Sequence, residues 1–171
     1  MENKITIGTY PPVFDRYISL VQNEGLNSLL EKQSKETENF FSSIPEDKWL
    51  YKYEENKWTI KEVLQHISDT ERVFNFRALV FARKDPNTFP SFDENEYAKN
   101  ANANDKSPGD LIEEFLAVRK STQLLFKGFS ETQLQAVGKT SSYEISVAAI
   151  GYMIAGHLAH HLNILKERYL Q

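Results

Sequence analysis

The chain has 171 residues, of which 40% are hydrophobic and 12% aromatic, and it carries a net charge of −4. This composition is sufficient for the hydrophobic core of one domain over residues 1–171 and excludes a chain that is disordered throughout. The mild charge, with no basic patch, argues against nucleic acid as a partner. The chain contains no cysteine, which excludes disulfides, thiolate metal ligands and a cysteine nucleophile.

No targeting segment is visible in the sequence. Nowhere do about eighteen apolar residues run together, as a membrane span requires. The first residues also lack the basic stretch and the apolar run of a signal peptide. We therefore expect a cytoplasmic protein with no membrane partner.

The first half of the chain contains three predicted helices. A short helix is predicted over residues 13–21, and the first long helix over residues 26–44, where apolar residues recur at helical spacing until a proline follows. The second long helix is predicted to begin at Thr59, because Thr59 and Glu62 have the spacing of a capping box. No helix breaker follows before Pro86, so this helix can extend for about 25 residues.

The second half begins with a long connection over residues 85–108, which is rich in polar residues and contains three aromatic ones. A connection of this length is usually functional or joins distant ends of two elements, and its aromatic residues indicate that it packs against the body. Further helices are predicted over residues 107–128, 130–138 and 146–169, the middle one short. Strand signals are scarce. The sequence thus predicts an all-α four-helix bundle with one long crossover.

Three of the four histidines lie within five residues of the last predicted helix. His157 and His161 replace apolar residues in a stripe that follows the alternating three-four step of a bundle seam, whereas His160 lies at its flank. Two inward-pointing imidazoles one turn apart need partners for their ring nitrogens, and a shared cation would satisfy them. Core histidines bonded to carbonyl or carboxylate groups remain the alternative, and His160 could replace His161 as a ligand.

The fourth histidine, His66, lies beside the apolar stripe of the second long helix and would be unremarkable alone. Asp69, three residues further on, is either an acceptor that orients a ligand histidine or an exposed charge.

Three separated parts of the sequence resemble the DinB/YfiT-like family. They read KWTIKEVLQHISDTER at residues 57–72, RALVFAR followed by FPSFDENEY within residues 77–97, and AGHLAHHLNIL at residues 155–165. The resemblance implies an up-down-down-up four-helix bundle that holds a divalent metal on three histidines. Those histidines correspond to His66, His157 and His161. It also implies a homodimer. Relatives in this family include metal-dependent transferases of low-molecular-weight thiols, a thiol-dependent isomerase and proteins labelled metal-dependent hydrolases.

Three neutral imidazoles leave a bound cation with its full charge and an open position, which is typical of catalytic sites. Such a cation makes a bound water or thiol more acidic. Hydrolysis also needs a general base, for which Asp69 and Glu71 are the candidates. No base is obvious, so we expect transfer of a low-molecular-weight thiol to a small electrophile. A metal-dependent hydrolase and a non-catalytic structural or stress protein are the alternatives. Imidazole ligands favour Zn or Ni, with Fe, Cu and Mn as further candidates.

Overall fold

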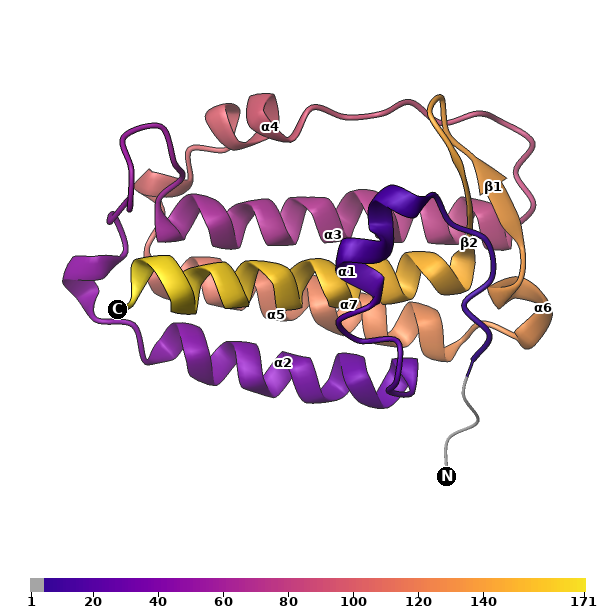
Figure 1. Ribbon diagram of the computed structural model, residues 1–171, viewed down its shortest axis with the longest axis horizontal. Helices are drawn as coiled ribbons and strands as arrows, with labels where there is room; N and C mark the ends of the chain where they lie inside the picture. Colours follow the sequence, from indigo (N-terminus) through magenta and orange to yellow (C-terminus); the bar gives the residue numbers. More distant parts are fainter. Residues whose placement is uncertain (1–4) are drawn as a thin grey trace.

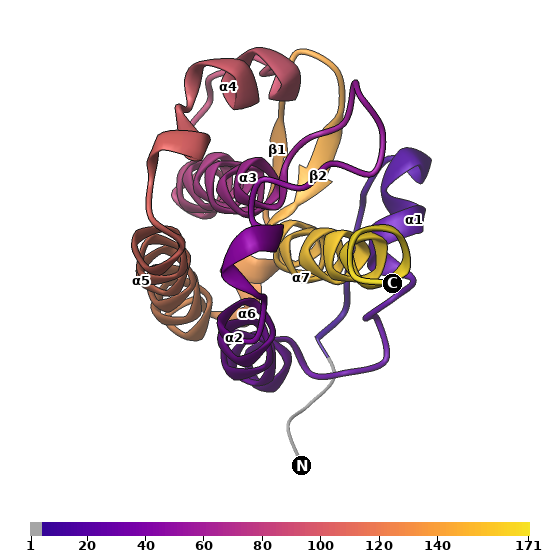
Figure 2. The same cartoon turned by 90° about the vertical axis from the view of Figure 1, so that its left-hand side faces the viewer.

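The structure is a computed structural model that describes residues 5–171. Four long helices form a bundle, with α3 and α5 running in one direction and the other two in the opposite direction (Figure 1). These helices are α2 (Leu26–Ser42), α3 (Ile60–Ala82), α5 (Pro108–Lys127) and α7 (Val147–Ile164). The end-on view shows them packed around a common axis (Figure 2). The prediction of an up-down-down-up four-helix bundle is confirmed.

Side-chain caps explain where the long helices begin. At the start of α3, Thr59 Oγ1 accepts from the Glu62 amide at 3.1 Å, and Glu62 Oε2 accepts from the Thr59 amide at 2.7 Å, so the predicted capping box is present. Ser107 caps α5 and Ser146 caps α7 in the same way, each accepting a backbone N–H with its hydroxyl. These caps fix the position of each helix along its own sequence.

The long connection between α3 and α5 crosses the outside of α3 (Figure 1). It contains the short helix α4 (Glu94–Asn100), which the sequence reading missed, and a 3₁₀ turn at Ala103–Asp105. Arg77 of α3 holds the segment down by donating to the carbonyl oxygen of Pro90 at 2.9 Å. The expectation that this crossover packs against the body is therefore confirmed.

The predicted helix at residues 130–138 is shorter than expected. Helix α6 spans only Glu131–Leu134, and the chain then enters an antiparallel hairpin of β1 (Val137–Lys139) and β2 (Glu144–Ser146). Gly138 makes this possible, because a Cβ there would lie 2.0 Å from the ring of Phe81. The all-α bundle thus carries one small sheet at one end.

The N-terminal short helix packs directly on the backbone of α7. It consists of a 3₁₀ turn at Pro12–Phe14 followed by α1 (Asp15–Ile18), where the sequence predicted one helix over residues 13–21. Gly156 allows the close approach, because a Cβ there would lie 2.2 Å from the carbonyl oxygen of Tyr17. This contact brings α1 against the middle of α7 (Figures 1 and 2).

The chain continues past α7 in a π-helical turn, Leu165–Tyr169. The Tyr169 hydroxyl donates to the carbonyl oxygen of Trp58 at 2.8 Å and so fixes the loop that precedes α3. None of the helices described in residues 5–171 is both long and apolar enough to cross a bilayer.

Candidate metal centre

Three histidine side chains from two helices meet inside the bundle. His157 Nε2 lies 3.0 Å from His66 Nε2 and 3.1 Å from His161 Nε2. One ring nitrogen from each of the three lies within 4.8 Å of the other two. His66 comes from α3, and the other two come from successive turns of α7. The structure therefore brings together the three residues that the sequence and the family resemblance selected.

The packing of neighbouring rings encloses this triad of His66, His157 and His161. The ring centroids of Trp58 and His66 lie 4.6 Å apart, and those of Tyr17 and His157 lie 5.5 Å apart. His66 and His157 are buried, and His161 is half-buried. The triad is thus closed to bulk water on most sides and reaches the surface at His161.

Burial keeps the three imidazoles neutral. Desolvation lowers the pKa of His66 to about 4. Desolvation, with the neighbouring histidines His66 and His160 and the charge of Arg16, lowers the pKa of His161 to about 3. The pKa of His157 is also well below its usual value, for the same reason of burial. Each ring therefore offers an unprotonated nitrogen at neutral pH.

Hydrogen bonds alone cannot satisfy this arrangement. The His157 Nε2 atom faces two other Nε2 atoms, but a neutral ring nitrogen has either one proton or one lone pair there. A cation that accepts all three lone pairs removes the conflict. Two nitrogens bound tetrahedrally at about 2.0–2.1 Å lie about 3.3 Å apart, close to the observed separations. The donor set fits a divalent metal that prefers imidazole ligands.

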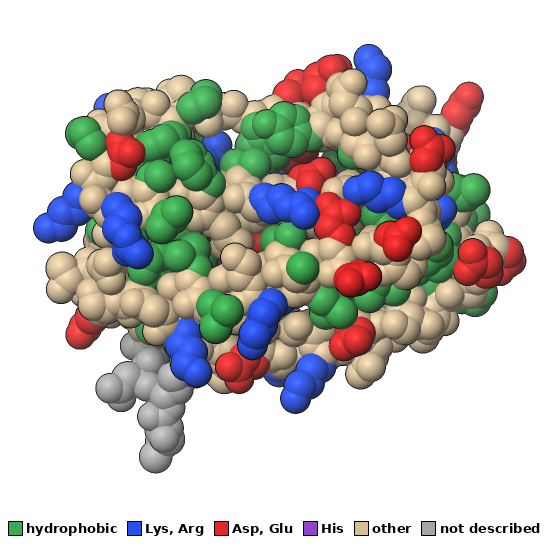
Figure 3. Space-filling view, turned by 180° about the vertical axis from the view of Figure 1, so that it is seen from behind, with side chains coloured by type: hydrophobic (Ala, Val, Ile, Leu, Met, Phe, Trp, Pro, Cys, Tyr) green, Lys and Arg blue, Asp and Glu red, His purple; other side chains and the backbone are tan. Residues whose placement is uncertain are grey.

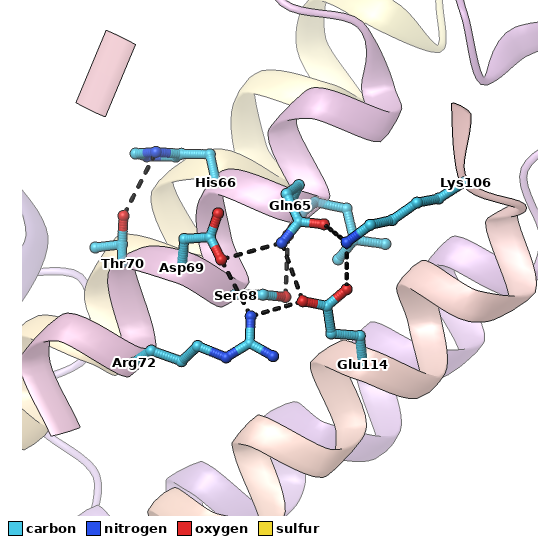
Figure 4. Close-up of polar contacts among 9 residues, drawn as sticks. Gln65, His66, Ser68, Asp69, Thr70, Arg72, Lys106 and Glu114 are labelled. Atoms are coloured by element: carbon cyan, nitrogen blue, oxygen red, sulfur yellow. Dashed lines mark hydrogen bonds and ion pairs between the residues drawn. The ribbon is translucent and has the colours of Figure 1, made fainter. Parts of the chain in front are cut away.

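Thr70, one turn after His66, lies near the other nitrogen of that ring. Its Oγ1 is 3.4 Å from His66 Nδ1, a long contact (Figure 4). Asp69, the acceptor that the sequence suggested, instead accepts from Gln65 and Arg72. The structure therefore places Asp69 outside the triad, because its side chain leaves α3 on a different side from His66.

The network around Asp69 joins α3 to α5 at the surface. Glu114 of α5 accepts from Gln65, Arg72 and Lys106 (Figure 4). Partial burial alone would raise the pKa of Glu114, but these donors lower it to about 2. The network is a set of ion pairs that orients the two helices.

The remaining candidates also lie away from the triad. His160 stands at the flank, with its ring 5.2 Å from that of Tyr17, so His161 and not His160 completes the set. Glu71 is buried and bonded to Arg119 of α5, 2.8 Å away. In residues 5–171, no carboxylate forms a hydrogen bond with a triad histidine.

Two hollows reach the triad, one at His157 and one at His161. The first has a volume of about 180 Å³, and the second about 240 Å³. The first is lined by five aromatic side chains of the N-terminal segment, α3, the crossover and the hairpin, and by Arg16, Thr70, Arg77, Ser91, Glu94 and Met153 besides His157. The second is lined by Tyr53, Trp58, Asn95, Ile164 and Tyr169, among others. These walls could not be predicted from the sequence, because they come from segments far apart in the chain.

The opposite side of the molecule has a surface of mixed character. Seen from behind, it presents charged side chains of both signs and no histidine (Figure 3).

Comparisons with known proteins agree with this fold. The sequence model of the DinB superfamily matches residues 29–165. A protein of Halalkalibacterium halodurans named "Putative metal-dependent hydrolase" is 28% identical over 123 residues, and the match spans 63% of this chain and 66% of that protein, just under two thirds of its length. The solved structure of YfiT from Bacillus subtilis, described as a "probable metal-dependent hydrolase with an unusual four-helix bundle topology", superposes with a TM-score of 0.59. That likeness covers 97% of both chains at 16% identity, so it supports the fold. The family match covers most of the chain, and the chain therefore belongs to the DinB superfamily.

Proposed function

We propose that this protein is a metal-dependent transferase that joins a low-molecular-weight thiol to a small electrophile. His66, His157 and His161 would hold the metal, with Zn or Ni expected and Fe, Cu or Mn as alternatives. The names of the relatives support the metal dependence, and the buried histidine triad supports its location.

The residues around the triad suit this chemistry. A divalent cation on three neutral imidazoles would keep its full charge and an open position, and would lower the pKa of a thiol or water that it binds. The chain itself supplies three converging nitrogens that burial keeps unprotonated. The rings of Tyr17 and Trp58 exclude water from two sides, which strengthens electrostatic interactions at the site.

The observation that carries the proposal is the pair of hollows. Transfer needs room for two organic molecules at one centre, whereas hydrolysis needs room for one organic molecule and a water. Glu94 lines the hollow at His157, and the next residue, Asn95, lines the hollow at His161. The start of α4 therefore lies between two separate spaces, each of which includes a triad residue.

The position of the carboxylates also favours transfer over hydrolysis. Asp69 belongs to the surface network and Glu71 to a buried ion pair, so neither is free to act as a general base. Glu94 lines the first hollow from its exposed rim and is the candidate base if the protein is a hydrolase. In thiol transfer the sulfur bonds to the electrophilic carbon, the bond to the leaving group breaks, and the thiol proton departs with that group.

Turnover assays test the proposal. Metal-loaded protein is incubated with bacillithiol, glutathione or mycothiol and monochlorobimane, and we expect a fluorescent thioether together with one chloride per conjugate. A protein in which His157 and His161 are both alanine is the control and should be inactive. Thiol-independent ester hydrolysis without conjugation would favour the hydrolase. No turnover, together with a large loss of melting temperature on chelation, would favour a structural or stress protein.

We also propose a cytoplasmic homodimer. The chain has no cysteine and therefore no disulfide, as is usual for proteins of the reducing cytoplasm, which also contains the low-molecular-weight thiols. Phe76 and Tyr97, about half exposed, lie beside an apolar hollow formed with Phe89 and Phe92, which gives a face for a second copy. Light scattering after size exclusion should give twice the 19.8 kDa mass of the chain.

A further inference from the structure

Arg77 is a buried cation whose two hydrogen-bond partners are neutral groups. Its side chain is on α3, only 3% exposed, and it lines the hollow at His157. Its guanidinium donates to the hydroxyl of Tyr143 at 2.8 Å and to the carbonyl oxygen of Pro90 at 2.9 Å, both neutral groups. Among the residues that the structure describes, no Asp or Glu forms an ion pair with it. A buried charge left in this state is costly.

The other buried arginine shows the contrast. Arg119 is fully buried and pairs with Glu71 at 2.8 Å, so its charge is compensated inside the protein. Arg77 has instead the faces of Phe74, Phe92 and Tyr143 within 6.0 Å of its guanidinium carbon. Cation–π contacts offset part of the cost of burial, but they supply no negative charge. Two hydrogen bonds also use only two of the five donors of the guanidinium.

A second arginine borders the same hollow. Arg16 of α1 is exposed and donates to the hydroxyl of Tyr17 at 2.7 Å. The acidic residue in the lining is Glu94, which is also exposed. The hollow therefore has two cations and one acid, and its deepest charged group is Arg77.

Much of the rest of the wall is apolar, and Thr70, Ser91 and two tyrosines contribute hydroxyl groups to it. Phe14, Phe74, Phe92 and Met153 enclose the space, and His157 places one end of it at the triad. A ligand that matches this wall has an apolar body and one anionic group.

We propose that the hollow at His157 binds a small apolar molecule that carries a carboxylate or phosphate group, with Arg77 receiving the anion and Arg16 attracting it from the rim. The planar fork of arginine binds either oxyanion in a bidentate manner. This inference rests on the proposed function in one respect, because it identifies the bound molecule as the electrophilic partner of the thiol.

Calorimetric titration with three probes tests the subsite. Phenylacetate, phenyl phosphate and phenylacetamide share an aromatic body and differ in charge. Each is titrated into the metal-free full-length protein, where no metal can hold the anion, and again into the zinc-loaded protein. We expect at least one anion to bind about tenfold more tightly than the neutral amide in both forms. The tighter of the two anions identifies carboxylate or phosphate as the natural group.

Substitutions then assign the effect to residues. Arg77→Lys keeps the charge but removes the fork, and Arg16→Ala removes the rim cation, so each should weaken anion binding several-fold. Glu94→Gln removes a like charge and should strengthen it. Arg83→Ala, an exposed arginine at the end of the same helix, is the matched control and should bind as the unchanged protein does. Arg16 and Glu94 are exposed, so their variants test the proposal even if Arg77→Lys folds poorly.

The proposal is overturned if the amide binds as tightly as both anions, or if the Arg16 and Glu94 variants behave like Arg83→Ala. Its failure is separable from failure of the proposed function. If the protein binds the anions but does not transfer thiols, the anion subsite stands and the proposed transferase activity is wrong. If it transfers thiols but shows no preference for anionic electrophiles, the transferase activity stands and the anion subsite is wrong.

Discussion

Arg119 of α5 donates to Glu71 of α3 across 2.8 Å in a place that solvent does not reach, with exposed fractions of 0% and 2%. The same guanidinium donates to Gln33 of α2, and Gln33 donates to the backbone oxygen of Ala155 in α7. One continuous series of polar contacts thus joins all four long helices. It passes close to the histidine triad, since Glu71 follows Thr70 in α3 and Ala155 lies two residues before His157 in α7.

Removal of Arg119 should therefore be severe. Arg119→Met leaves the Glu71 carboxylate buried without its cationic partner, and we expect a loss of about 3–5 kcal/mol in the free energy of unfolding, measured with urea. Arg72→Met is the matched control, because Arg72 forms its ion pairs at the surface, and it should cost about 0–1 kcal/mol. Equal losses in the two variants would show that the buried pair has no special role.

Metal binding should depend on the two histidines of α7. In a protein with both His157→Ala and His161→Ala, elemental analysis after metal supplementation should find less than about a tenth of an equivalent, against about one in the unchanged protein. His160→Ala should retain the metal, because that ring lies outside the triad. Undiminished binding in the double variant would move the site elsewhere.

The stability of the metal-free protein should fall as the pH drops from about 6.5 to about 4. Burial lowers the pKa of His66 to about 4, so within this window the unfolded chain binds a proton that the folded chain does not. Each unit of lowering corresponds to about 1.4 kcal/mol. Urea unfolding at several pH values measures how the free energy of unfolding changes with pH, and we expect a smaller change per pH unit for His66→Gln than for the unchanged protein. An unchanged slope would mean that His66 is not held neutral. Glu114 has a pKa of about 2, below its ordinary value of 4.5, so its contribution to the free energy of unfolding is lost only as the pH falls below about 4.5.

Gly156→Ala should separate α1 from α7. The added Cβ would stand 2.2 Å from the Tyr17 carbonyl oxygen, which is backbone and cannot turn aside. We expect a loss of about 1–3 kcal/mol in the free energy of unfolding. Gly109→Ala adds the same atom 3.8 Å from its nearest neighbour, and it should leave the protein as stable or slightly more so. A neutral result at Gly156 would contradict the close packing of α1.

The helices and two of the three triad histidines were predictable because their signals are local. His157 and His161 share one helix, so their spacing alone places them on one face. His66 meets them only because α3 packs on α7, and periodicity within one helix contains no information on that packing; the family resemblance supplied it. The walls of the hollows were beyond prediction for the same reason. Arg77 and Tyr143 are 66 residues apart in sequence and meet through tertiary structure.

The hairpin was missed for a different physical reason. Its strands have three residues each, too short for alternation to be distinguished from a loop. The fit of Gly138 against Phe81 decides the local structure there, and that contact is long-range. Asp69 was an ambiguous candidate because residues three apart on a helix share a face only in part, and the donors Gln65 and Arg72 draw its side chain away.

The contact between Trp58 and His66 gives the protein its own optical probe. The chain has two tryptophans, and the other, Trp49, is buried against Phe41. Trp58 lies 4.6 Å from a triad ring, so an ion arriving at that ring changes the electric field around one indole and leaves the other as an internal reference. Paramagnetic Ni or Cu would quench its emission, whereas Zn would only shift it. Binding of a metal to the triad would therefore be followed by ultraviolet fluorescence without a label.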